Sequence, residues 1–325
     1  MRYHRRWLLL SAGALLVGSC TDSTSPGPLA ARMSFLVQPQ ATGAGMPMSP
    51  PIVVALEDAS GQTVTGAKGP VTLALGANPG HARLAGSTTV DAVNGVATFR
   101  GLSLGVSDTG YTLTASSPGV GTETSDTFSI TAGPAARLVF ETQPISANAG
   151  APITPAVTVR VVDGFGNPTT SSVVVTLATT TVGVALQGTT SVAAVNGMAT
   201  FSDLSMAQPG AGYVLAASAV GMTPVFSNAF SIFPGSPAKL VFTVEPAYAQ
   251  IGLALSPPVQ VAIQDSFGNP TPSATNAITL ALGANPGNAT LSGTLTANAV
   301  GGVASFGNLK LDQPGVGYTL VASSG

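Results

Sequence analysis

The stretch VTVRVVDGFGNP, residues 157–168, decides the fold because it joins an alternating strand pattern to a tight turn. Three valines alternate with a threonine and an arginine, which is the period-two pattern of a half-buried strand. The last six residues, Asp163 to Pro168, combine aspartate, glycine, asparagine and proline, which favour a turn through Asx and fixed-φ geometry. A similar stretch, VQVAIQDSFGNP, occupies residues 259–270, and its last six residues are nearly identical to residues 163–168, so the strand and its turn are part of a repeat.

Other motifs recur at the same spacing of about 100 residues. The sequence V-N-G-V-A-T-F at residues 93–99 returns as V-N-G-M-A-T-F at 195–201 and as V-G-G-V-A-S-F at 300–306. Asn-Gly between two alternating runs predicts a type I′ hairpin, because both turn residues need a positive φ. The sequence LALGANPG, at residues 73–80 and 280–287, lacks the lysine and helix of a phosphate loop and indicates duplication.

Alternating runs in the second repeat predict eight short strands, and composition agrees with an all-β chain. Charged residues are only 7% of the sequence, and glycine and proline contribute 39 and 25 residues. Eight strands in about 100 residues predict a Greek-key sandwich of immunoglobulin-like type. The predicted strands are residues 138–141, 157–163, 173–178, 184–187, 190–195, 198–204, 213–217 and 229–233.

A Gly-Tyr-x-Leu motif lies in the last third of each repeat and places a tyrosine near the start of the predicted penultimate strand. Tyr111, Tyr213 and Tyr318 occupy this position. A tyrosine corner, with a buried ring and a hydroxyl bonded to nearby backbone, is typical of immunoglobulin-like sandwiches. We therefore expect all three tyrosines to be structural.

The first 20 residues have the form of an export signal. Arg2, Arg5 and Arg6 precede an apolar stretch of about twelve residues, which is too short to span a bilayer of about 30 Å. The stretch ends in V-G-S-C, which resembles the lipobox of bacterial lipoproteins. That resemblance implies that Cys20, the only cysteine of the chain, carries the lipid, although an ordinary signal peptide with an incidental cysteine is the alternative.

Removal of residues 1–19 changes the formal net charge from −2 to about −5 and leaves no cluster of cations. Nucleic acid is therefore excluded as an expected partner. The predicted organisation has five parts: a lipoprotein signal peptide (1–19), a lipidated cysteine with a flexible tether (20–32), repeat 1 (33–133), repeat 2 (134–235) and a truncated repeat 3 (236–325).

Together, the A-x-x-L-x-F opening, the V-x-V-x-x-x-D-x-x-G-N-P segment, the V-N-G-x-A-x-F hairpin and the G-Y-x-L corner resemble the bacterial immunoglobulin-like (Big) repeats of invasin and intimin type. The resemblance covers residues 32–325. It implies a tandem-repeat protein of the bacterial cell surface, anchored in the outer membrane or elsewhere in the envelope, with a role in cell adhesion. It specifies the fold well and an activity poorly.

Few residues outside this pattern are candidates for chemistry. His81 is the only histidine after the signal, and its counterpart is Asn288, so catalysis there is not expected. A zinc site is not expected, because it would need histidine or cysteine ligands that are absent. Calcium has weak candidates in two Asp-x-Phe-Gly-Asn loops, but each loop supplies one carboxylate for an ion that takes six to eight oxygens. These calcium candidates are Asp163, Asn167, Asp265 and Asn269.

The third repeat stops within or just after its tyrosine-corner strand, whereas repeats 1 and 2 continue with F-S-I strands at residues 128–130 and 230–232. A sandwich without its last strand exposes an unpaired edge. Two explanations stay open: the sequence is part of a longer protein, which is simpler, or the groove accepts a strand from a partner.

The sequence therefore predicts a non-catalytic surface protein without cofactor or small-molecule substrate. The membrane is the expected partner through Cys20, together with a surface protein or a polysaccharide. Two alternatives are a module that binds glycans or cell wall, and spacer repeats for a functional domain beyond Gly325.

Overall fold

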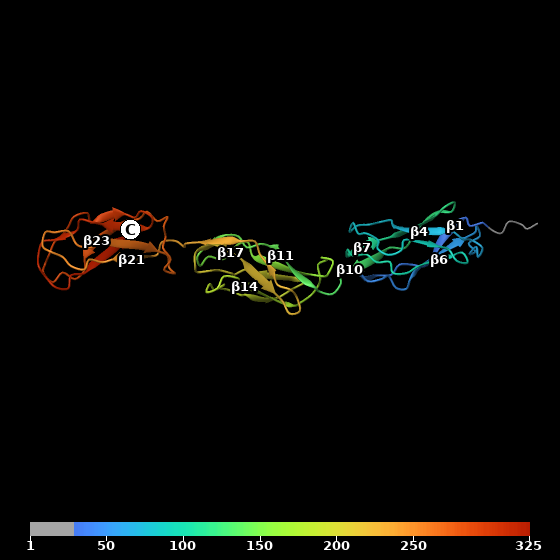
Figure 1. Ribbon diagram of the computed structural model, residues 1–325, viewed down its shortest axis with the longest axis horizontal. Helices are drawn as coiled ribbons and strands as arrows, with labels where there is room; N and C mark the ends of the chain where they lie inside the picture. Colours follow the sequence, from blue (N-terminus) through green and yellow to red (C-terminus); the bar gives the residue numbers. More distant parts are fainter. Residues whose placement is uncertain (1–28) are drawn as a thin grey trace, which may run out of the picture. The chain divides into compact units, whose positions relative to one another are not determined.

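The structure, a computed structural model, describes residues 29–325 and contains there only strands, turns and loops (Figure 1). The signal peptide and the lipidation site predicted at Cys20 lie outside the described residues. In the described part of the chain, no helix is long and apolar enough to cross a membrane.

The chain divides into two compact units. One contains the residues up to Thr42 together with Met46–Ile130, and the other contains Gly43–Gly45 and Thr131–Gly325. Two separate hydrophobic cores lie in the second unit, one within residues 138–232 and one within residues 255–311. The residue boundaries of the three repeats stay a prediction, but each sheet contains strands of one repeat only.

Repeats 1 and 2 have the same ten strands in the same order. Those of repeat 1 are β1 (Arg32–Val37), β2 (Thr42–Gly43), β3 (Ile52–Glu57), β4 (Pro70–Leu75), β5 (Thr89–Asp91), β6 (Val96–Phe99), β7 (Asp108–Tyr111), β8 (Leu113–Ser117), β9 (Gly121–Thr124) and β10 (Phe128–Thr131). Those of repeat 2 are β11 (Arg137–Thr142), β12 (Ala147–Asn148), β13 (Val157–Val162), β14 (Val174–Thr179), β15 (Ser191–Ala193), β16 (Met198–Phe201), β17 (Gly210–Tyr213), β18 (Leu215–Ser218), β19 (Val225–Phe226) and β20 (Phe230–Phe233).

Repeat 3 has eight strands. The eight are β21 (Lys239–Val244), β22 (Val259–Gln264), β23 (Ala277–Leu282), β24 (Leu291–Ser292), β25 (Thr296–Asn298), β26 (Val303–Phe306), β27 (Lys310–Leu311) and β28 (Leu320–Ser324). No strand of residues 29–325 takes the places of β12, β17, β19 and β20 in it, whereas β24 and β27 pair as a separate two-stranded sheet.

Each repeat is a two-layer sandwich. In repeat 2 the antiparallel order β11-β13-β16 forms one sheet and β15-β14-β18-β19 forms the other. A small third sheet, β12-β20-β17, closes one end, with β12 parallel to β20. This order, with the last strand β20 beside the second strand β12, is that of the immunoglobulin-like sandwich. The prediction of three tandem immunoglobulin-like sandwiches, the third incomplete, is confirmed.

The alternating pattern of residues 157–162 places its valines in the core. Val157, Val159 and Val161 are fully buried, whereas Thr158 and Arg160 are half-exposed. Val159 pairs with Phe140 of β11 on one side and with Ala199 of β16 on the other. β13 is therefore the central strand of its sheet and holds the Asp163 turn at its end.

The two predicted Asn-Gly turns are present, each closed by a single bridge pair, but the strands on either side of each turn belong to different sheets. Asn94 and Gly95 have φ values of 54° and 79°, and Asn196 and Gly197 have 49° and 73°. Gly197 is required for a second reason, because a Cβ there would lie 2.0 Å from the backbone oxygen of Thr169. The turn therefore joins two strands and also contacts the neighbouring loop.

One predicted strand is wrong. Residues 184–187 form no strand, and only Gln187 makes an isolated bridge, to Ser205. A turn just before them causes this, since Gly183 has a φ of 80° and Val184 donates its N–H to the oxygen of Thr181 at 3.4 Å. The apolar alternation there fits a loop that packs its valine and leucine against the core.

Candidate functional site

The two Asp-x-Phe-Gly-Asn loops are the most organised polar groups of the second compact unit. Asp163 follows β13 and Asp265 follows β22, and their exposed fractions are 1% and 0%. A buried carboxylate is costly unless hydrogen bonds compensate for the lost water. The loops must therefore provide donors.

Four N–H groups point at the Asp163 carboxylate. Its Oδ1 accepts the backbone N–H groups of Phe165 and Asn167, both at 2.9 Å. Its Oδ2 accepts the side-chain amide of Asn167 at 2.8 Å and the backbone N–H of Gly133 at 2.8 Å. Two oxygens have about four lone-pair directions, so the carboxylate is fully occupied.

Asp265 has the same four contacts. Phe267 and Asn269 donate their backbone N–H groups to Oδ1, both at 2.9 Å. The Asn269 amide at 2.8 Å and the Gly235 N–H at 2.9 Å reach Oδ2. Repeats 2 and 3 therefore have the same arrangement around nearly identical loops. In each repeat, one of the four donors lies 30 residues upstream, in the linker.

Burial by itself would raise the pKa of the Asp163 carboxyl, but hydrogen bonds from Asn167, Gly133 and Phe165 hold that pKa below its usual range. The same balance of burial against donors lowers the pKa of Asp265. Both carboxyls are therefore charged at neutral pH, and hydrogen bonds from N–H groups stabilise the charge.

This donor set does not match a calcium site. The atoms around each carboxylate are N–H hydrogens, which a cation would have to displace, whereas calcium takes oxygen ligands. The structure places Asp163 with Asn167, and Asp265 with Asn269, as the sequence indicated. Within residues 29–325, no three His, Cys, Asp or Glu side chains gather where they could hold a metal ion.

The linker residues at these loops lie close to the buried carboxylates. A Cβ on Gly133 would lie 3.4 Å from Oδ2 of Asp163, and a Cβ on Gly235 would lie 3.2 Å from Oδ2 of Asp265. Each linker glycine thus approaches the carboxylate closely and is fixed to the repeat that follows it. We call each pair of linker glycine and buried aspartate a linker clamp.

Inside the second compact unit, the Asp265 loop also reaches residues of repeat 2. The Asn269 amide donates to the backbone oxygen of Ala207 at 2.8 Å. A Cβ on Gly150 would lie only 2.2 Å from the ring of Phe267, so this glycine packs directly against the aromatic edge. The remainder of Phe267 faces solvent, and its exposed fraction is 48%.

The three tyrosines share one geometry. The hydroxyls of Tyr111, Tyr213 and Tyr318 donate to backbone oxygens five residues upstream, at 3.0, 3.1 and 3.1 Å. The ring of Tyr213 packs 6.1 Å from that of Phe230 in β20, and Tyr111 packs 5.9 Å from Phe128 in β10. Burial, and then the charge of Asp108, raises the pKa of Tyr111.

The Gly-Ala-Asn-Pro-Gly loop belongs to this tyrosine corner. A Cβ on Gly80 would lie 2.2 Å from the hydroxyl of Tyr111, so only glycine fits beneath that side chain. Asn78 stabilises the loop through two hydrogen bonds to the backbone of Ala82, at 2.8 and 2.9 Å. His81 is exposed and has a φ of 52°, which matches its counterpart Asn288 at 49°. The histidine occupies a turn position.

Comparison with known proteins gives structural neighbours only. No protein-family model and no curated protein matches the sequence. The adhesin FdeC of Escherichia coli is 16% identical, with 92% of this chain and 94% of that chain covered and a TM-score of 0.36. The D00-D0 domain of intimin is 15% identical (62% and 98%, TM-score 0.35), and invasin, a bacterial integrin-binding protein, is 15% identical (89% and 56%, TM-score 0.31).

Proposed function

We propose that this chain is a non-catalytic, lipid-anchored protein of the bacterial cell surface, whose immunoglobulin-like repeats act as adhesion or interaction modules. The observation that carries the proposal is the linker clamp, which occurs twice with the same partners: Gly133 with Asp163, and Gly235 with Asp265. Each clamp holds the glycine before a repeat against a turn of that repeat, so the same junction is built twice. Repetition of one junction suits a protein built from serial interaction modules.

The polar residues support a non-catalytic role. A catalytic carboxylate needs an open side from which to act on a substrate. Asp163 and Asp265 have no such side, because four N–H groups surround each carboxylate. His81, the one histidine of the exported chain, serves a turn.

The lipid anchor is proposed from the sequence alone. Cys20 follows an apolar stretch that begins after three arginines, and residues 21–32 form a polar, proline-containing tether. A diacylglycerol on Cys20 with an N-terminal acyl chain provides more than one chain, which stable anchoring requires. The outer membrane or the cell surface is the proposed location.

Expression of the full chain with a C-terminal epitope tag tests the anchor. Wild type should fractionate with membranes and incorporate labelled palmitate, whereas Cys20→Ala should lose the label and leave the membrane fraction. Ser19→Ala is the matched control, because a small residue remains before the cysteine. Equal labelling of wild type and Cys20→Ala would refute lipidation at this residue.

Beads coated with the chain test adhesion. They should bind at least one member of a panel of immobilised extracellular-matrix and bacterial surface proteins, and beads with bovine albumin should not. Retention only on purified polysaccharide or peptidoglycan would contradict adhesion to proteins and support the glycan-binding alternative. No retention on any surface would favour spacer repeats, which sequencing of the gene past the Gly325 codon would examine.

A further inference from the structure

Two asparagine-glycine pairs occur in the chain, Asn94-Gly95 and Asn196-Gly197. Each pair forms the turn that connects one sheet of its repeat to the other, and both asparagines are exposed to solvent. Within residues 29–325, no hydrogen bond holds either side-chain amide. Both amides are therefore open to reaction with their own backbone.

An asparagine that precedes a glycine can react spontaneously with it. The backbone nitrogen of the glycine attacks Cγ of the asparagine, loses its proton and expels the side-chain nitrogen as ammonia. The product is a five-membered succinimide, and water opens this ring at either carbonyl to give aspartate or isoaspartate. Glycine favours the attack because it has no Cβ to crowd its nitrogen. The reaction needs only water and hydroxide.

The folded turn opposes this reaction. The succinimide ring requires a backbone conformation of asparagine that differs from the left-handed turn, in which Asn94 and Asn196 have φ values of 54° and 49°. The turn must therefore open locally before the glycine nitrogen can reach Cγ. In both repeats, two hydrogen bonds between the residues that flank the pair close the turn. Any further hydrogen bond to the turn should slow the reaction.

The two turns differ at the nitrogen that attacks. In repeat 2, the N–H of Gly197 donates to the backbone oxygen of Ser171 at 3.1 Å. In repeat 1, the corresponding loop closes on itself, because Ala67 donates its N–H to the oxygen of Val64 at 2.8 Å. No residue of 29–325 accepts the N–H of Gly95. The nitrogen of Gly95 is therefore the freer nucleophile.

We propose that Asn94 is a site of spontaneous modification, at which Asn94 and Gly95 form a succinimide that water converts to isoaspartate and aspartate. Asn196 reacts more slowly, because the nitrogen of Gly197 must first lose a hydrogen bond. One net hydrogen bond corresponds to about two- to tenfold in an opening equilibrium, and we expect this ratio between the two rates. Repeat 3 has Gly301 at this position and therefore no amide that could react.

Isoaspartate changes the turn more than aspartate does, because it adds one CH₂ group to the backbone before the glycine nitrogen. The oxygen of Gly95 accepts the N–H of Leu56 at 2.8 Å, and Leu56 lies in β3, the central strand of its sheet. A Cβ on Gly95 would lie 2.4 Å from the oxygen of Val64, so the glycine has little room to shift. Modification at Asn94 should therefore loosen the turn and its bond to β3.

Incubation of the full chain at mildly alkaline pH, in water labelled with heavy oxygen, tests the proposal. Ring opening should add one labelled oxygen to the tryptic peptide of residues 84–100, and a protein isoaspartyl methyltransferase measures its isoaspartate. Label should appear at Asn94 about two- to tenfold faster than at Asn196. The proposal fails if Asn94 stays unlabelled while the free peptide of residues 84–100 converts, or if Asn196 reacts as fast as Asn94.

Unfolding in guanidinium chloride provides the control for the hydrogen bond. Neither glycine nitrogen is bonded to a loop in the unfolded chain, so both sites should then convert at similar rates. A ratio that survives unfolding would assign the difference to the residues after the glycines, Val96 and Met198, and would overturn the role of the Ser171 contact.

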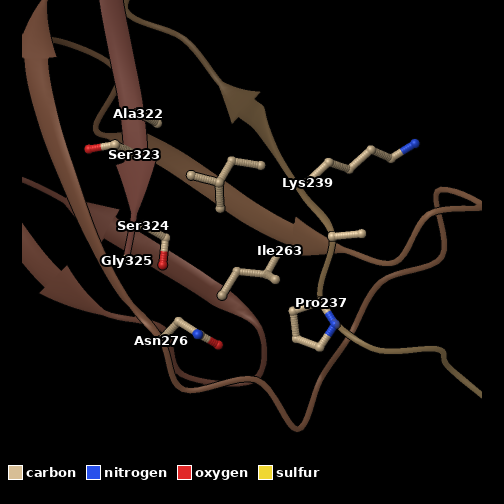
Figure 2. Close-up of a pocket in the computed structure, with 10 residues that line it drawn as sticks. Pro237, Lys239, Ile263, Asn276, Ala322, Ser323, Ser324 and Gly325 are labelled. Carbon is tan, nitrogen blue, oxygen red and sulfur yellow. The ribbon is translucent and has the colours of Figure 1, made fainter.

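Asn276 is the control for exposure. It is exposed, and Figure 2 shows its side chain among the residues that line a cavity. The next residue, Ala277, carries a Cβ and pairs with Asn298 inside a sheet. Asn276 should therefore stay unlabelled. Conversion of Asn276 at the rate of Asn94 would show that exposure alone determines the reaction and would overturn the proposal.

Asn94→Gly tests the structural consequence, because it copies Gly301 of repeat 3 and suits a positive φ. Hydrogen exchange in residues 52–57 and 93–97 should be faster in aged wild type than in fresh wild type, whereas aged and fresh Asn94→Gly should agree. Equal exchange in fresh wild type and in aged wild type that contains isoaspartate would refute the loosening of the turn.

Discussion

The backbone N–H of Gly235 donates a 2.9 Å hydrogen bond to Oδ2 of Asp265, which is fully buried. Gly133 and Asp163 repeat the contact at 2.8 Å. In both cases the aspartate also organises its own loop, so one carboxylate joins a turn to a linker. The most direct predictions concern this group.

Asp265→Asn should destabilise repeat 3 by about 2–4 kcal/mol, because an amide presents only one oxygen to four converging N–H donors and turns an NH₂ group toward two of them. Chemical denaturation, followed by hydrogen exchange in residues 236–325, measures the loss. Asp91→Asn is the matched control, because Asp91 is exposed at the end of β5 and should change stability by less than about 0.5 kcal/mol. A cost for Asp265→Asn as small as that of the control would contradict the clamp.

Acid should weaken both linker clamps. The folded-state pKa values of Asp163 and Asp265 lie below their ordinary value, so the unfolded chain binds more protons in acid. Their contribution to stability is therefore complete above the unfolded pKa, near 4, and is lost as the pH falls through the lower folded pKa.

The unfolding free energy, measured by urea denaturation between pH 7 and pH 2.5, should decrease below about pH 4.5. The double variant Asp163→Asn/Asp265→Asn should show a shallower decrease, since two of the responsible groups no longer titrate. Parallel pH profiles of wild type and double variant would show that other carboxyls cause the acid sensitivity.

The hairpin glycine of repeat 2 should be intolerant of any side chain. Gly197→Ala places a Cβ 2.0 Å from the oxygen of Thr169 and keeps a φ of 73°, so we expect a loss of about 2–4 kcal/mol. Gly164→Ala is the control, because its Cβ would meet no atom within 4 Å. Thermal or urea unfolding of both variants compares the costs, and similar values would argue against the close approach.

Sequence reasoning found the features that are periodic or local. The alternation in residues 157–162 predicted β13, and Asn196-Gly197 predicted a hairpin whose geometry depends on those two residues. The strand expected at residues 184–187 fails because the Gly183 turn overrides a short apolar alternation. β12 was missed because a strand of two residues has no measurable period.

The candidate site depends on contacts between residues that lie far apart in the sequence. Asx chemistry predicts the turn from Asp163 to Asn167, and the turn is present. The fourth donor, Gly133, lies 30 residues earlier in the linker, and no local pattern connects it to the carboxylate. One signal was available: Gly133 and Gly235 precede their aspartates by the same interval in both repeats.

The tyrosine corners of repeats 2 and 3 should contribute unequally, because Tyr213 is 5% exposed whereas Tyr318 is only partly buried. Tyr213→Phe removes a hydroxyl that bonds the oxygen of Gln208 at 3.1 Å, at a cost of about 0.5–1.5 kcal/mol. Tyr318→Phe removes a similar bond to Gln313, but water reaches this hydroxyl and the orphaned oxygen, so the cost should be smaller. Hydrogen exchange in residues 210–218 and 315–324 separates the two repeats. Equal costs of the two substitutions would show that the exposure of the corner tyrosine does not set its contribution.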